Sequence, residues 1–515
     1  MADSQTPAVP SRCPSPAPTL IDETKEGPTV HEYSPARRYT LLVIFCLAQF
    51  LDTFNVTSLY SAIPAMAMSM GIAEGESTWI ISAYQLTFAS FLLISGRISD
   101  VYNPKFAFIG GVFVLAIFSL CSGFVSSKIP LFVLRALTGV AAAMAIPSAV
   151  TLLVGIFPEP TEQSRALGVF GGCGAVGIGE HSQMRVAECE EIDQSLVLGL
   201  VIGAIFVQYA SWPWVFWFVA IVCVPIVGLS VFLIAKQEPK EVRGGGAKWK
   251  SLDLFGVTTL TVALILFIFA VTSAATTGWG SSRVIASLII SMLMTAGFFY
   301  YETRIPADQA AIPPRTWFLP NFSVLFGTAL FPFFWWGTVF TIYTNLWQSV
   351  WGWSAIMTAV HMLPIGVSSF PVSLTGPLSH KINPKWLLLF GEALCIVSTI
   401  LLAFADRPTR YWPYMFPGFI LGSAGAMFVY THTNIAIFRT TPASMAGTVG
   451  AIVNGALQLG SAVGISIVGS IESSIEERHA GYAGRAASFW FLLGIGALEF
   501  IAMLVFYRIR KENAK

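Results

Sequence analysis

The chain has 515 residues, of which 55% are hydrophobic and only 11% are charged, and its 29 lysines and arginines nearly balance its 28 aspartates and glutamates. A soluble globular chain carries about 25% charged residues, so this composition excludes an ordinary soluble enzyme, a disordered protein and a basic nucleic-acid binder. The mean hydropathy of +0.69 indicates that lipid is the solvent for most of the chain.

The N-terminal segment is polar and rich in proline, with seven prolines in the first 36 residues. We expect residues 1–38 to form a disordered cytoplasmic tail, because a signal peptide would need an apolar segment there. The seven cysteines form no CxxC or Cys/His cluster, which predicts neither a disulfide framework nor a metal site. We expect no cofactor.

After the tail, apolar segments long enough to cross a bilayer follow one another. We predict an all-α integral membrane protein with 14 transmembrane helices and both termini in the cytoplasm. In that orientation the cytoplasmic segments hold 21 lysines and arginines, the outer loops hold six and the spans hold two, as the positive-inside rule requires. The spans are expected near 39–63, 79–98, 106–126, 131–157, 166–208, 213–235, 253–273, 284–301, 321–347, 354–375, 386–405, 413–432, 445–470 and 487–507.

An internal repeat divides these spans into two sets. Residues 96–105 read GRISDVYNPK and residues 376–385 read GPLSHKINPK, with five identical positions. Parallel six-helix repeats are a known transporter architecture. We therefore predict the following organisation: a six-helix half at 39–235, a cytoplasmic linker at 236–252, two extra central helices at 253–301, a cytoplasmic loop at 302–320, a second six-helix half at 321–507 and a cytoplasmic tail at 508–515.

Four motifs of the chain resemble those of the major facilitator superfamily, in its fourteen-helix drug:proton antiporter branch. They are the 96–105 loop, the first-span stretch Leu51 to Pro64, the fourth-span stretch Arg135 to Gly139, and the glycine-rich fifth span, which lacks the branch's Gly-Pro pair. The residue sequence is most similar to that of fungal aminotriazole-resistance-like and secondary-metabolite exporters. The resemblance implies a major-facilitator-type fold with two extra central helices.

Two charged residues within predicted spans are candidates for proton coupling. Asp52 lies about halfway along the first span, where a carboxylate must face a cavity, form a pair or take up a proton. The alternative is a structural hydrogen bond to a neighbouring helix. The resemblance implies that Arg135 influences the protonation of a nearby carboxylate, and the alternative is an arginine that extends to the outer interface.

The loop repeat and the glycines have their own implied roles. The resemblance implies that Gly96, Arg97, Asp100 and Lys105 form a cytoplasmic latch between the halves, whereas a plain tight turn is the alternative. A further set of glycines is expected to allow close helix packing: Gly139, Gly168, Gly172 and Gly177.

Several polar and aromatic residues are candidates for the wall of a substrate cavity: Gln85, Trp335, Trp336, Asn454 and Gln458. Asn454 and Gln458 are four residues apart and so share one helix face. The alternative is a structural role, because a lone glutamine or asparagine more often forms a hydrogen bond between helices. Aromatic residues in a span more often face lipid.

A charged segment interrupts the fifth span. Residues 179–196 hold six charges, whereas joining Ile178 to Val197 gives one continuous glycine-rich span. Six charges inside a span would be costly in lipid. Our hypothesis is that this segment of 18 codons is an unspliced intron in the gene sequence, and the alternative is a loop that leaves the membrane.

These observations predict a proton-coupled secondary transporter that exports small organic molecules such as drugs, toxins or secondary metabolites by alternating access. An importer of a small nutrient or ion such as ammonium is the first alternative, and a sensor without transport or an inactive product is the second. We find no nucleophile–base or metal constellation and expect no enzyme activity. The expected partners are the lipid bilayer, protons and a small-molecule substrate but no nucleic acid, and the expected state is a monomer in the plasma membrane, with the vacuolar membrane as the alternative.

Overall fold

Apolar segments in lipid must satisfy their backbone hydrogen bonds internally, and helices do so within one segment. The computed structural model describes residues 33–101, 103–157, 159, 162, 166, 169–170, 195–235, 253–305, 312, 314–373, 375–376, 378–441, 446–476 and 481–509, and these contain helices and no strand. The prediction of an all-α fold is confirmed. The predicted tail up to residue 32, the 236–252 linker and most of the 179–196 segment lie outside the described residues.

The helices of the first set follow one another from α1 to α8. They are α1 (Pro35–Met70), the short α2 (Glu74–Ser77), α3 (Trp79–Val101), α4 (Pro104–Ser122), α5 (Lys128–Ile156), α7 (Ser195–Tyr209) and α8 (Pro213–Leu233). The pair α9 (Leu254–Thr277) and α10 (Ser282–Glu302) comes next.

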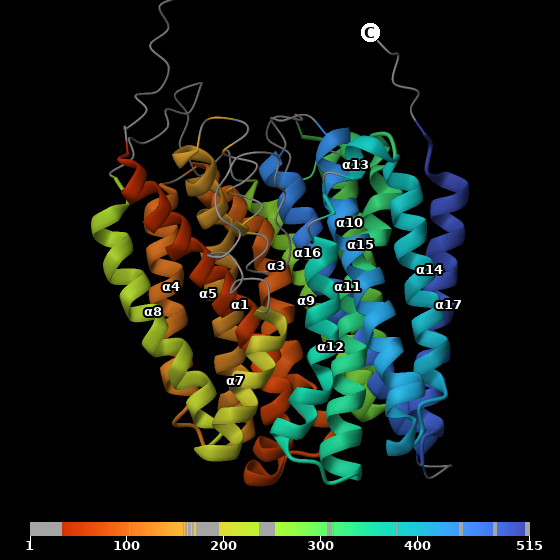
Figure 1. The fold of residues 1–515 in the computed structure, drawn as a ribbon. Coiled ribbons are helices and arrows are strands. Elements are labelled where there is room, and N and C mark those ends of the chain that lie inside the picture. Colours follow the sequence, from red (N-terminus) through yellow and green to blue (C-terminus); the bar gives the residue numbers. More distant parts are fainter. Residues whose placement is uncertain are drawn as a thin grey trace, which may run out of the picture.

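The second set begins after the short η3 (Pro314–Phe318). It consists of α11 (Phe322–Asn345), η4 (Leu346–Val350), α12 (Ala355–Ser373), α13 (Leu378–Lys381), α14 (Pro384–Ala403), η5 (Pro408–Arg410), η6 (Tyr411–Met415), α15 (Phe416–Thr440), α16 (Ala446–Glu476) and α17 (Ala483–Phe506). Figure 1 shows that α1 begins and α17 ends at the same end of the bundle, which we call the terminal end; the opposite end is the distal end.

Within the described residues, eleven helices are long and apolar enough to cross a membrane. The apolar parts of α3 and α7 are shorter, at Trp79–Leu92 and Gly199–Tyr209, and α15 is not among the eleven. The total of 14 spans therefore stays a prediction, although each predicted span contains a helix in the structure.

The two sets share one pattern of helix packing. In the first set α5 packs on α3 and α4, α8 packs on α4, and α1 packs on α7 and α8. In the second set α15 packs on α12 and α14, α17 packs on α14, and α11 packs on α16 and α17. The helices at equivalent places in the two sequences thus have equivalent neighbours, which is what an internal repeat predicts.

The repeated Asn-Pro-Lys residues perform the same task in both sets. The side chains of Asn103 and Asn383 cap α4 and α14 by accepting the backbone N–H of the following lysine, at 2.9 and 3.0 Å. Lys105 Nζ donates to two carbonyls at the end of α8, at 2.9 and 2.6 Å. Lys385 Nζ donates to two carbonyls at the end of α17, at 2.7 and 3.0 Å. Each lysine thus neutralises the negative end of the last helix in its own set.

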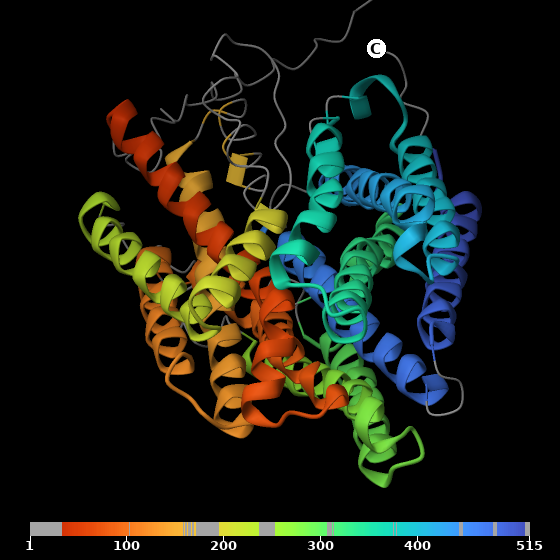
Figure 2. The same cartoon turned by 60° about the horizontal axis from the view of Figure 1, so that its bottom comes forward.

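The sets meet along two symmetrical contacts, α3 with α16 and α7 with α12. The extra helix α9 packs on both α3 and α16 and carries α10 on its outer side. Figure 2 shows this pair between the two sets, on one side of the bundle. The extra helices therefore cover one of the two contacts between the sets.

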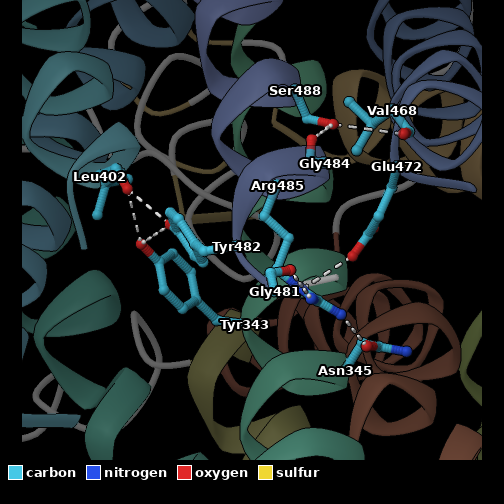
Figure 3. Close-up of polar contacts among 10 residues, drawn as sticks. All are labelled: Tyr343, Asn345, Leu402, Val468, Glu472, Gly481, Tyr482, Gly484, Arg485 and Ser488. Atoms are coloured by element: carbon cyan, nitrogen blue, oxygen red, sulfur yellow. Dashed lines mark hydrogen bonds and ion pairs between the residues drawn. The ribbon is translucent and has the colours of Figure 1, made fainter. Parts of the chain in front are cut away.

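A buried ion pair fixes the distal end of the second set (Figure 3). Arg485 Nε lies 2.9 Å from Glu472 Oε1, and the side chains are 4% and 12% exposed. Arg485 also donates to Asn345 Oδ1 at 2.9 Å, so α17, α16 and α11 are joined by one guanidinium. The predicted spans ended at 470 and began at 487, whereas α16 continues to Glu476 and α17 starts at Ala483. Both charged residues are thus in helices and not in an outer loop.

Candidate functional site

A cavity of about 80 Å³ lies between the two sets, where α1, α3, α11, α15 and α16 meet. A buried water occupies about 10–15 Å³ of such space, so the cavity has room for several waters. The aromatic part of its wall consists of Tyr60, Phe88, Phe333, Trp336, Phe340 and Tyr430. The polar part consists of Gln49, Asp52, Thr53, Thr57, Gln85, Asn454, Gln458 and Ser461.

Asp52 is the carboxylate in the wall of this cavity. It is 7% exposed, and its Oδ1 accepts a hydrogen bond from the hydroxyl of Tyr84 on α3. The hydrogen bond to a neighbouring helix that we considered as the structural alternative is therefore present, and the cavity is present as well.

Arg135 on α5 lies behind Tyr84. Its side chain is fully buried and donates to Ile80 O at 2.9 Å, Asn55 Oδ1 at 3.1 Å and Asn55 O at 3.0 Å. The guanidinium carbon lies 4.7 Å from the centre of the Tyr84 ring, a cation–π contact. Arg135 therefore points inward toward α1 and α3, not outward to the interface, and Tyr84 connects it to Asp52.

Tyr84 is the residue of this network that the sequence analysis missed. It is adjacent to Gln85, which was selected because an amide in a span is conspicuous, whereas a tyrosine in a span is commonplace. Only the helix packing shows that the Tyr84 ring lies between a carboxylate and a guanidinium.

Four of the five predicted cavity residues line the cavity: Gln85, Trp336, Asn454 and Gln458. Gln85 Nε2 also donates to Ser461 Oγ at 2.8 Å and so joins α3 to α16. Trp335 is buried elsewhere, because a Cβ placed on Gly422 of α15 would lie 2.0 Å from its ring. Neighbouring tryptophans on one helix point in different directions, so only one of the two reaches the cavity.

The lining is more exposed toward the terminal end. At the distal side the rings of Tyr60 and Phe340 stack at 5.3 Å between centres, and both are buried. At the terminal side Asn454 is exposed, and Phe333 and Tyr430 are half-buried. The aromatic stack therefore closes the distal side of the cavity across α1 and α11.

The predicted latch residues are only partly described. Gly96 lies where α3 passes α16, and a Cβ placed on it would be 3.9 Å from Ala451 Cβ. Lys105 binds the end of α8, which is a contact within one set. The side chains of Arg97 and Asp100 lie outside the described part of the chain, so their contacts between halves stay a prediction.

Close packing around the site depends on glycines. A Cβ on Gly139 would lie 2.2 Å from Thr87 Oγ1 and 2.3 Å from Tyr84 O, so a glycine there lets α5 approach α3. Gly199 and Gly203 on α7 have similarly close neighbours on α1, at Thr57 and Ser58. The predicted packing glycines Gly168, Gly172 and Gly177 lie outside the described residues.

The chain matches the family model of the Major Facilitator Superfamily over residues 45–179 and 195–465. The match stops at residue 179 and resumes at 195, so it leaves out almost all of the charged 179–196 segment.

Relatives match most of the chain. A major facilitator superfamily multidrug transporter of Aspergillus fumigatus is 24% identical over 92% of this chain and 88% of its own length. The puromycin resistance protein of Streptomyces alboniger is 28% identical, over 85% and 82%. The low affinity ammonium transporter of Saccharomyces cerevisiae is 26% identical, over 88% and 85%.

Proposed function

The chain belongs to the major facilitator superfamily, and we propose that it is a proton-coupled transporter that exports small amphipathic organic molecules by alternating access. The observation that carries the proposal is Asp52 in the wall of the cavity, connected through Tyr84 to Arg135. The names of two relatives, a multidrug transporter and a puromycin resistance protein, support export.

Asp52 gives the cavity one place where a proton and a substrate compete. Ionised Asp52 is balanced by the buried guanidinium of Arg135 behind Tyr84. A proton from cavity water, or a cationic group on a substrate, binds the same carboxylate. Because one carboxylate does not hold both, entry of a proton releases the substrate. This exclusion couples the two fluxes in opposite directions.

The remaining lining defines the class of substrate. Aromatic side chains from α3, α11 and α15 offer apolar and cation–π contacts, and the amides of Gln85, Asn454 and Gln458 offer hydrogen bonds. Pockets for drug-sized ligands measure about 300–1,000 Å³, so the cavity must widen for such ligands. Widening at the terminal side, while the Tyr60–Phe340 stack closes the distal side, is the inward-facing half of an alternating-access cycle.

The placement in the cell is part of the proposal. The excess of lysine and arginine on the terminal side supports a cytoplasmic location for that side, so the exposed part of the cavity wall faces the cytoplasm. We place the protein in the plasma membrane, where export leaves the cell.

Import of ammonium or a similar small cation is the second candidate. The 80 Å³ cavity with one carboxylate and several aromatic rings suits a small cation without widening, and one relative is named an ammonium transporter.

The test compares secreted and intracellular small molecules in cells with the protein, without it, and with D52N. Both the full chain and a form lacking residues 179–196 are expressed. Export predicts a compound that accumulates inside when the protein is absent or carries D52N. A compound depleted inside under those conditions supports import. Unchanged small molecules, with both forms shown to be in the membrane, would contradict transport and favour a sensor or an inactive product.

A further inference from the structure

Two carboxyl groups lie at the contact of two helices in the second set, away from the cavity. Glu392 is on α14 and Glu499 is on α17, and these helices pack against each other. The helices approach at Gly496, where a Cβ would lie 3.7 Å from Ile396 Cγ1. Glu499 is one turn beyond Gly496, and Glu392 is one turn before Ile396. Because the two helices are antiparallel, both carboxyl groups lie at the same level.

Neither group has the partners that a buried charge needs. Glu392 is fully buried, and Glu499 is half-buried. Among the described residues, neither oxygen of Glu392 has a hydrogen-bond partner, and Glu499 Oε2 has none either. The charge of Glu392 acts on Glu499, and the ion pairs of the described residues include neither glutamate.

The elements packed around the pair offer no compensating charge. The titratable neighbour on α14 is Cys395, and its thiol already donates to Gly422 O on α15 at 3.4 Å. Helix α11 contributes the apolar ring of Phe331 beside Gly496. The described neighbours named here thus offer the pair an apolar ring and a thiol, and no charge.

The pair also lies deep in the membrane-spanning region. Glu392 is about 12 Å along α14 from Pro384, and Glu499 is about 10 Å along α17 from Phe506, at a rise of about 1.5 Å per residue. The apolar core of a bilayer is about 30 Å thick, so both groups lie within it. Two unpaired carboxylates at that depth would repel each other and lack solvation.

A proton is the ligand that removes this cost. Among the described residues there is no group of three or more histidine, cysteine, aspartate or glutamate side chains that could hold a metal ion, and two carboxylates alone give too few oxygens for a metal cation. We propose that Glu392 and Glu499 form a proton-binding site, at which the two carboxyl groups hold at least one proton between α14 and α17 at neutral pH. The O–H of one carboxyl group donates to an oxygen of the other.

This site is separate from the transport cavity and does not depend on the proposed function. It places a proton-binding site in the second helix set, at the contact of α17 with α14. Losing the proton would place like charges across that contact and loosen α17.

Dicyclohexylcarbodiimide tests the site, because it reacts with protonated carboxyl groups in apolar surroundings. The carboxyl O–H protonates the reagent, the carboxylate adds to its central carbon, and rearrangement gives a stable acylurea that mass spectrometry locates. We expect modification of Glu392 or Glu499 in the full chain in lipid nanodiscs at pH 7, declining as the pH rises. Glu472 is the matched control, because this largely buried carboxylate is paired with Arg485 and should stay unmodified.

Infrared spectroscopy gives a second measurement that does not depend on access of the reagent. The spectrum of the wild type minus that of E392Q/E499Q at pH 7 should contain the C=O stretch of a protonated carboxyl group. Glutamine keeps the side-chain volume, so the double variant is expected to fold. A difference spectrum with carboxylate bands alone would overturn the proposal, whatever the reagent does. Equal modification of Glu472 and the pair would overturn it too.

Discussion

The two helix sets pack in the same way, but equivalent places hold charged side chains in the first set and neutral side chains in the second. In the first set α1, α3 and α5 are joined by Asp52, Tyr84 and Arg135. In the second set the corresponding helices α11, α12 and α15 are joined by a neutral chain, in which Trp336 Nε1 donates to Ser423 Oγ at 3.1 Å and Ser423 Oγ donates to Ile365 O at 2.7 Å. Duplication of a fold therefore does not duplicate its site, and the charged half carries the coupling in our proposal.

The largest effect should come from removing charge in the first set. We expect D52N to abolish proton-driven transport, because the amide cannot exchange a proton at the cavity wall. S423A breaks the neutral network at the corresponding place and should lower the free energy of unfolding by about 1 kcal/mol, while proton flux continues. Proton flux into membrane vesicles on addition of the exported compound compares the two variants.

Proton flux in the two variants can also contradict this difference between the two sets. If S423A stops proton flux as completely as D52N while both variants reach the membrane, the two sets share the coupling. A D52N variant with the wild-type proton flux would remove Asp52 from the mechanism altogether.

The distal ends offer the next comparison, between a buried and an exposed ion pair. The Glu472–Arg485 pair is 12% and 4% exposed, whereas the Glu76–Lys128 pair of the first set is 34% and 37% exposed. E472Q leaves a buried guanidinium without its counter-charge and should lower the free energy of unfolding by about 3 kcal/mol. Thermal unfolding in detergent, with E76Q as the control, checks this; equal losses in the two variants would contradict the role of burial.

A third pair of variants separates helix contact from helix propensity on α5. G139A places a methyl group against Thr87 and the Tyr84 carbonyl and should destabilise by about 1–3 kcal/mol. G155A lies on the same helix with nothing within 4 Å and should stabilise by up to about 1 kcal/mol, since alanine favours helix. Thermal unfolding measures both. If G155A destabilises the protein, its effect does not come from helix propensity, and the comparison of the two variants fails.

The features of the fold and of the site that the sequence predicts are those for which a residue pattern has a direct physical cause. Apolar runs predicted the helices, because a segment in lipid must satisfy its backbone hydrogen bonds internally. The repeated Asn-Pro-Lys predicted the two sets, because it lies at equivalent turns in both. The depth of Asp52 in its span predicted that it faces a cavity or forms a pair, and it lines the cavity and accepts a hydrogen bond from Tyr84. Tyr84 and the direction of Trp335 were beyond prediction, because uniformly apolar helices carry no periodicity that shows which face turns inward.

The smallest effect concerns the exposed pair at the distal end of the first set, where Lys128 Nζ donates to Glu76 Oε2 at 2.6 Å. This hydrogen bond holds the pKa of Glu76 below its ordinary value of 4.5. A carboxylate with a lowered pKa in the folded state stabilises the fold above its ordinary pKa and loses that contribution as the pH falls through the folded value. The wild type should therefore exceed E76Q in stability by at most about 1 kcal/mol at pH 7, and the difference should shrink progressively below about pH 4.5. High salt at pH 7 should shrink it as well, because both side chains are partly in water. Melting temperatures at pH 7, at pH 3.5 and in salt measure the difference, and one that persists unchanged in acid would show that Glu76 acts through its helix and not through its charge.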